Sequence, residues 1–258
     1  MTETDKTGLW QELKLCLGLL TRLPTGLTGI ESPEIMARAS RWFPLVGLLV
    51  GGLSAAVLYG GAVLDLPNSA AALIALGASI LLTGALHEDG LADTADGLGG
   101  GHDRDSRLAI MRDSHIGTYG VLALILSVGL RWSALVALMG NSVGAAMAAL
   151  IVAASVSRLV PVMLMNVLSP ARRDGMAVGA GSPAGPAVRL ACALALGSLF
   201  FLSHWPAMVL TIIAALAVFV ALGAFAVRRI GGQTGDVLGA SQQGTEVLVL
   251  LCLATVGP

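Results

Sequence analysis

The stretch SAAALIALGASILLTGALHEDGLADTADGLGGG, residues 69–101, passes from an uncharged apolar run into an acidic cluster and then into glycines. Its first part has the composition of a membrane-spanning helix, which needs about 20 mostly apolar residues. Its second part contains Glu88, Asp89, Asp93 and Asp96. Because like charges on one helix repel, this combination predicts a membrane protein that holds a cation at the end of a span.

The composition of the whole chain is that of a polytopic membrane protein. Of its 258 residues, 55% are hydrophobic and 12% are charged, about half the charged fraction of soluble domains. The net charge of -1 offers no basic surface for nucleic acid. We find no repeat and no linker, and therefore predict a single transmembrane catalytic domain over residues 1–258.

Seven segments are apolar and long enough to cross a bilayer. They comprise residues 43–64, 69–86, 119–139, 143–165, 187–203, 207–227 and 237–256. Before them, Leu9, Leu13, Cys16 and Leu20 form one helical stripe, which predicts an N-terminal helix lying in the membrane interface. The predicted fold class is an all-α, polytopic membrane helix bundle with about seven transmembrane helices plus this interfacial helix.

The distribution of Lys and Arg predicts the orientation of the spans. Nearly all of them lie in the N-terminal arm, after Leu86, around Arg172 and Arg173, and at Arg228 and Arg229. By the positive-inside rule these connections are cytoplasmic. We therefore expect a multi-pass membrane protein whose acidic cluster faces the cytoplasm.

Two glycine motifs indicate where spans approach each other closely. Gly47 and Gly51 form one Gly-x-x-x-Gly motif, and Gly140 and Gly144 form another. Glycines at this spacing let two helix backbones pack together, although the signal is common and carries no function.

The aspartates of the acidic cluster have helical spacing. Asp89, Asp93 and Asp96 are spaced i, i+4 and i+7, which places them within about 60° of one another on a helix. A set of oxygen ligands favours a hard ion, Mg²⁺ or Mn²⁺ before Zn²⁺. The alternative is the solvated acidic face of an interfacial helix. Asp236 could complete the site from another helix, or could serve only as a helix cap.

Glycines and arginines that follow the cluster indicate a phosphorylated substrate. Backbone N–H groups at Gly99 and Gly100 could approach a phosphate, although a flexible hinge explains the glycines equally well. Arg104, Arg107 and Arg112 could bind its oxygens, and the alternative is anchoring at the membrane surface.

Two further arginines lie inside predicted spans. Arg131 and Arg158 fall within residues 119–139 and 143–165. Charge inside a membrane is a functional hypothesis by default. A structural ion pair is an equally good interpretation, and so is a side chain that reaches the headgroups.

The stretches LTGALHEDGLADTADGLGGG and RLAIMRDSHIGTYG closely resemble the cobalamin synthase family, the adenosylcobinamide-GDP ribazoletransferases. LLTRLP, RWFPLVGLLVGG and GGQTGDVLGASQQGTE extend the resemblance over most of the chain. It implies an Mg²⁺-dependent, multi-pass enzyme of the bacterial cytoplasmic (inner) membrane. Its substrates are adenosylcobinamide-GDP and α-ribazole, or α-ribazole 5′-phosphate. A ribose hydroxyl attacks the diphosphate, GMP leaves, and adenosylcobalamin or its 5′-phosphate forms. The oligomeric state stays open, a homo-oligomer included.

The motif and the resemblance together predict a role for each candidate residue. The predicted metal ligands are Asp89, Asp93, Asp96 and Glu88, where the family commonly has Leu at the position of Glu88. The candidates for the catalytic base are Asp96, Asp113 and Asp236. The predicted substrate-binding residues are Arg104, Arg107, Arg112, Arg158, Gly99 and Gly100.

Two other functions compete with this interpretation. A CDP-alcohol phosphotransferase of phospholipid synthesis would carry Ala-Arg shortly after Asp-Gly, and neither Asp-Gly here is followed by that Arg. A divalent-cation transporter would place its carboxylates near the middle of the membrane, whereas these are expected at one cytoplasmic edge.

Overall fold

The computed structural model describes residues 8–26 and 32–257, so the predicted N-terminal arm before Gly8 lies outside it. Over these residues the chain forms thirteen α-helices and one short 3₁₀-helix, with no β-strand. An isolated bridge joins Pro170 to Gln233. The predicted all-α membrane bundle is confirmed.

The helices follow one another with short connections. Their bounds are α1 (Leu9–Leu20), α2 (Pro33–Ala39), the 3₁₀-helix (Ser40–Trp42), α3 (Phe43–Val63), α4 (Asn68–Thr83), α5 (Leu86–Gly100), α6 (Arg104–Ile110), α7 (Thr118–Asn141), α8 (Val143–Ser157), α9 (Leu159–Val167), α10 (Met176–Ala180), α11 (Gly185–Leu202), α12 (Trp205–Ile230) and α13 (Gly235–Val256).

Six helical segments of the described chain are long and apolar enough to cross a membrane. They are Pro33–Val63, Thr118–Asn141, Val143–Val167, Gly185–Leu202, Trp205–Ile230 and Gly235–Val256. A seventh crossing exists only if α4 and α5 count together, and these two helices meet at an angle of 89°. The expectation of one unbroken span over residues 69–86 is therefore wrong.

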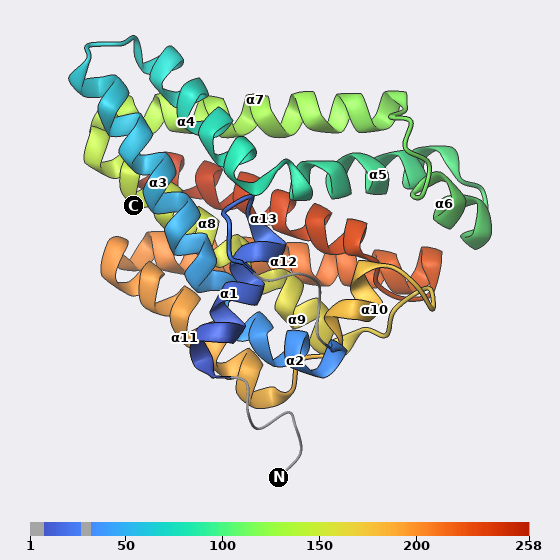
Figure 1. Ribbon diagram of the computed structural model, residues 1–258. Coiled ribbons are helices and arrows are strands. Elements are labelled where there is room, and N and C mark those ends of the chain that lie inside the picture. The colour runs from blue at the N-terminus through green and yellow to red at the C-terminus, as the bar shows by residue number, and fades with distance from the viewer. Residues whose placement is uncertain (1–7, 27–31, 258) are drawn as a thin grey trace.

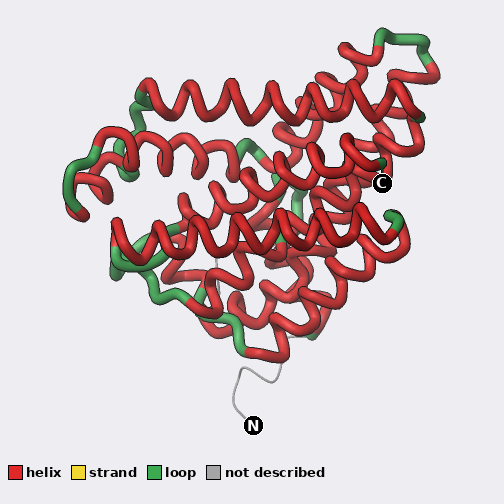
Figure 2. Tube along the Cα trace, turned by 180° about the vertical axis from the view of Figure 1, so that it is seen from behind, coloured by secondary structure: helices red, strands yellow, loops and turns green. Residues whose placement is uncertain are grey.

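The long helices lie in layers (Figure 1). Helices α5, α7, α12 and α13 run side by side across the molecule, with α13 in contact with each of the other three (Figures 1 and 2). Helix α3 packs along α8, while α1, α2 and α10 gather on another side. The turn between α3 and α4 and the helix α6 lie at opposite ends (Figure 1).

The predicted close approach at Gly47 and Gly51 is confirmed. A Cβ atom on Gly47 would lie 2.3 Å from the carbonyl oxygen of Ala154, and one on Gly51 would lie 2.7 Å from the Cα of Ile151, both on α8. The second motif makes no such contact, because a Cβ on Gly140 would meet nothing within 4 Å.

Helix α1 is present as predicted, and half of the predicted stripe is buried. Its last two residues are buried, whereas its first, Leu9, is 63% exposed. Glu12, which lies outside the stripe, is 1% exposed. The carboxylate of Glu12 accepts hydrogen bonds from Arg38 at 2.6 Å and from Arg41 Nε at 2.9 Å. These ion pairs tie α1 to the segment that leads into α3.

We predict that Gly47→Leu prevents α3 from packing on α8. The added side chain would collide with backbone rather than with a movable side chain, so the cost in unfolding free energy should be at the upper end of about 1–3 kcal/mol. Thermal unfolding of the purified protein in detergent measures it. Gly52→Leu is the matched control, because nothing lies within 4 Å of a Cβ at Gly52. Equal melting temperatures for the two variants would contradict this packing.

Candidate active site

A sharp break in the backbone sets the position of the acidic helix. Gly84 and Ala85 both adopt left-handed conformations, with φ of 64° and 57°. Glycine does this without strain, whereas alanine needs support from its surroundings. The chain therefore turns before α5 begins, and the first turn of α5 enters the interior with His87 and Glu88 buried.

Helix α5 crosses α13 at two glycines. A Cβ on Gly90 would lie 2.9 Å from the carbonyl oxygen of Asp236, and one on Gly239 would lie 3.2 Å from the Cα of Gly90. Asp89 on α5 and Asp236 in the first turn of α13 consequently line the same cavity. The cavity has a volume of about 80 Å³ and extends toward His87, Arg158 and Phe43.

Asp93 and Arg172 complete the charged surroundings of this cavity. Asp93, one turn after Asp89, lies within electrostatic range of both Asp89 and Asp236. Arg172 donates a hydrogen bond to Asp236 Oδ2 at 2.6 Å, and Thr234 donates to the same oxygen at 3.2 Å. The sequence indicates Arg172 only as part of a cytoplasmic connection, and its contact with Asp236 depends on the tertiary structure.

Asp96 does not line this cavity and instead caps α7, the second helix after α5. Its carboxylate accepts hydrogen bonds from the backbone N–H groups of Gly117 at 2.7 Å and Gly120 at 2.9 Å, at the start of α7. Negative charge is favourable at a helix N-terminus, where backbone N–H groups lack partners. The structure therefore gives both oxygens of Asp96 a structural partner.

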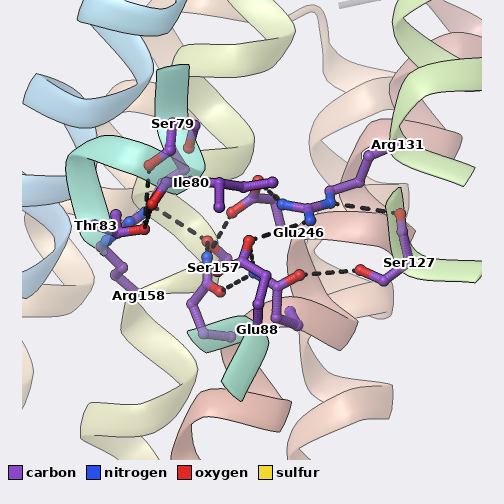
Figure 3. Close-up of polar contacts among 12 residues, drawn as sticks. Ser79, Ile80, Thr83, Glu88, Ser127, Arg131, Ser157, Arg158 and Glu246 are labelled. Carbon is purple, nitrogen blue, oxygen red and sulfur yellow. Dashed lines mark hydrogen bonds and ion pairs between the residues drawn. The ribbon is translucent and has the colours of Figure 1, made fainter. Parts of the chain in front are cut away.

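Glu88 also lies apart from the other carboxylates, in a buried polar network (Figure 3). Its Oε1 accepts hydrogen bonds from Arg131 at 3.2 Å and from Gln243 at 3.1 Å. Arg131 also donates to Glu246 at 3.2 Å. Arg131 is 1% exposed, so the structure shows the structural ion pair, one of the three interpretations of this arginine.

Arg158 has a different environment. It lies at the junction between α8 and α9 and is 2% exposed. Its Nη1 donates to the carbonyl oxygen of Ala154 at 2.9 Å, but its Nε has no hydrogen-bond partner among the described residues. Arg158 is therefore a buried guanidinium that has no bonded carboxylate and that lines a cavity. Such a group could bind an anion.

The glycines after the acidic cluster belong to a helix. Gly99 and Gly100 form the last turn of α5, an end that leaves backbone carbonyl oxygens rather than N–H groups without partners. Gly101 packs against Arg107, which is buried. The structure brings none of these residues to the cavity.

Arg104 and Arg112 lie beside a second, wider cleft together with Arg172 and Arg173. Asp113 is in an exposed turn and does not line the cavity; its carboxylate lies 2.6 Å from Nδ1 of His115. This contact raises the pKa of His115 and, by the reciprocal hydrogen bond, lowers the pKa of Asp113.

No three histidine, cysteine, aspartate or glutamate side chains converge as a ready-made metal site within residues 8–26 and 32–257. Asp89 and Asp93 on α5 could still hold Mg²⁺. This ion keeps several waters and usually takes only one or two carboxylates together with substrate phosphates.

Comparisons with known proteins agree on one family. Residues 12–254 match the family model described as cobalamin-5-phosphate synthase. A protein of Bradyrhizobium diazoefficiens named adenosylcobinamide-GDP ribazoletransferase is 46% identical over 98% of this chain and 96% of its own. A protein of the same name from Ralstonia nicotianae is 41% identical over 94% of both chains. No solved structure shows significant similarity.

We predict that Asp96→Asn destabilises the protein, because an amide offers only one oxygen to the two N–H groups of α7. The free energy of unfolding should fall by about 1–3 kcal/mol. Asp65→Asn is the control, since the Asp65 side chain is exposed and makes no hydrogen bond within the described chain. Thermal unfolding in detergent compares them, and an equal melting temperature would show that Asp96 is not a structural cap.

Proposed function

Because the chain belongs to the cobalamin-5-phosphate synthase family, we propose that it is a membrane-bound adenosylcobinamide-GDP ribazoletransferase. Relatives with this name cover nearly its full length at 41–46% identity. The observation that carries the proposal is the cavity between α5 and α13, which Asp89, Asp236 and Arg158 line together. Carboxylates for a cation and an arginine for an anion are what a diphosphate needs.

The proposed reaction exchanges one phosphorus–oxygen bond for another. A ribose hydroxyl oxygen of α-ribazole, or of its 5′-phosphate, bonds to the phosphorus that carries the cobinamide arm. The bond from that phosphorus to the bridging oxygen breaks, and GMP leaves with the bonding electrons. The hydroxyl proton passes to a base, and the product is adenosylcobalamin or its 5′-phosphate.

Asp89 and Asp93 are the residues that would hold Mg²⁺. They lie one turn apart on α5 and supply the oxygen donors that this ion prefers. When bound, Mg²⁺ would neutralise charge on the diphosphate oxygens. Asp96 and Glu88 are occupied by the α7 N-terminus and by Arg131, so we leave them out of the proposed ligand set.

Asp236 and Arg158 have separate proposed roles in the cavity. Among the three candidate bases, Asp236 is the one that lines the cavity. It faces Asp89 across the helix crossing, and Arg172 and Thr234 hold its carboxylate, so it would accept the hydroxyl proton. Arg158, fixed by Ala154 through one nitrogen, would donate a guanidinium N–H to a phosphate oxygen.

We further propose that the active site faces the cytoplasm across the inner membrane. The arginine-bearing connections after α9 and after α12 lie toward the end of the molecule that carries α6 (Figure 1). The α3–α4 turn, which has no Lys or Arg, lies at the other end. This separation agrees with the positive-inside rule.

We predict that Asp89→Asn, Asp93→Asn and Asp236→Asn each lower turnover at least 100-fold, about 2.7 kcal/mol in activation free energy. The assay is GMP release from adenosylcobinamide-GDP with α-ribazole and Mg²⁺ in liposomes. Asp65→Asn, in the α3–α4 turn, is the control and should keep the parent's activity. If two of the three variants turn over at nearly the parent's rate, the proposed reaction centre is wrong.

The orientation can be tested by labelling single cysteines. In a background with Cys16, Cys192 and Cys252 replaced by Ser, Asn68→Cys should react with a membrane-impermeant maleimide added outside intact cells. Ser106→Cys, in α6, should react only after the membrane is opened. The opposite pattern would refute a cytoplasmic active site.

A further inference from the structure

Beside the acidic cavity lies a wider cleft of opposite charge. Its volume is about 530 Å³, within the range of about 300–1,000 Å³ that is typical of small-molecule sites. Helix α6 and the turn after it form one wall, and residues 170–173 form the other. The charged residues of its lining are Arg104, Arg112, Arg172, Arg173 and Asp105.

The four arginines differ in how firmly they are held. Arg104 is fixed, because its Nε donates to the carbonyl oxygen of Ile230 at 3.0 Å and its Nη2 to that of Ala171 at 2.6 Å. Arg112 is half exposed and pairs with the exposed Asp174. Arg173 has no hydrogen bond or ion pair within the described residues. Two guanidinium groups are thus available to a ligand without disturbing the core.

The cleft and the acidic cavity meet at one ion pair. Arg172 lines the cleft, and its partner Asp236 lines the cavity. The loop that carries Arg172 is held in place by backbone hydrogen bonds between Ala171 and Gln233 at 2.8 Å and between Gln233 and Ser169 at 2.9 Å. A ligand in the cleft would therefore lie next to the reacting groups while leaving the cavity open.

Size and charge together indicate what the cleft binds. The cavity, at about 80 Å³, is far too small for a nucleotide, whereas the cleft is large enough. Guanidinium groups match the oxygens of a phosphate in pairs. We propose that the cleft is the subsite for a nucleoside 5′-monophosphate group, an inference that rests on the proposed function.

Two parts of the proposed substrates contain a nucleoside 5′-monophosphate group. One is the GMP portion of adenosylcobinamide-GDP, which leaves as GMP. The other is the acceptor when it arrives as α-ribazole 5′-phosphate. Both combine a phosphate with a ribose and a base, and both must lie beside the reacting phosphorus.

Binding of GMP, compared with guanosine, is the first test. Calorimetry on the purified full-length protein measures each affinity, and the same comparison is made for α-ribazole 5′-phosphate and α-ribazole. We expect the phosphate to improve binding of at least one nucleoside at least tenfold. The double variant R112A/R173A should lose that gain.

Two control variants distinguish binding in the cleft from a general effect of the protein's charge on ligand affinity. Arg229→Ala removes an exposed arginine at the end of α12, outside the cleft, and should bind like the parent. Asp174→Ala breaks the ion pair of Arg112 but keeps the arginine, so it should bind at least as tightly as the parent.

Steady-state kinetics then identify which phosphate occupies the cleft. If it is the GMP portion, R112A/R173A raises the KM for adenosylcobinamide-GDP and the inhibition constant of GMP at least tenfold. If it is the acceptor's phosphate, the variant raises the KM for α-ribazole 5′-phosphate and leaves that for α-ribazole unchanged.

The inference is overturned if the phosphate does not improve binding of either nucleoside to the parent, or if R112A/R173A binds both phosphates like the parent. It is also overturned if Arg229→Ala weakens binding as much as the double variant does. Binding needs no turnover, so a parent protein that binds GMP but transfers nothing would refute the proposed function and retain the cleft.

Discussion

The crossing of α5 and α13 at Gly90 and Gly239 is the contact on which the candidate site depends. The backbones approach so closely that a Cβ at Gly90 would lie 2.9 Å from a carbonyl oxygen of α13. Any larger residue would separate the helices and, with them, Asp89 from Asp236. The cavity between these carboxylates exists because the sequence leaves both positions without a side chain.

Buried charge holds the same helices in register. Arg131 on α7 reaches Glu88 on α5 and Glu246 on α13, so three helices share one ion-pair network (Figure 3). Removing one partner from such a network leaves a buried charge uncompensated, which typically costs about 3–5 kcal/mol. The network therefore favours one relative position of α5 and α13, the one in which their glycines meet.

The structure places two spaces of different charge beside each other. A narrow cavity is lined by Asp89 and Asp236 together with Arg158, and a wider cleft, lined mainly by arginines, can attract a phosphate. The ion pair between Arg172 and Asp236 links them, because each partner lines one of the two spaces. This division would let a diphosphate place its reacting phosphorus near the carboxylates and its nucleotide end among the arginines.

The sequence alone determined the fold class and the acidic helix, since apolar run length and the i, i+4, i+7 spacing are local properties of the chain. It could not determine what each carboxylate meets. Asp96 finds Gly117 and Gly120, and Glu88 finds Arg131 and Gln243. The same helical period is compatible with capping, ion pairing or metal binding. Only the tertiary structure chose among these roles, because their partners lie 21 to 155 residues away along the chain.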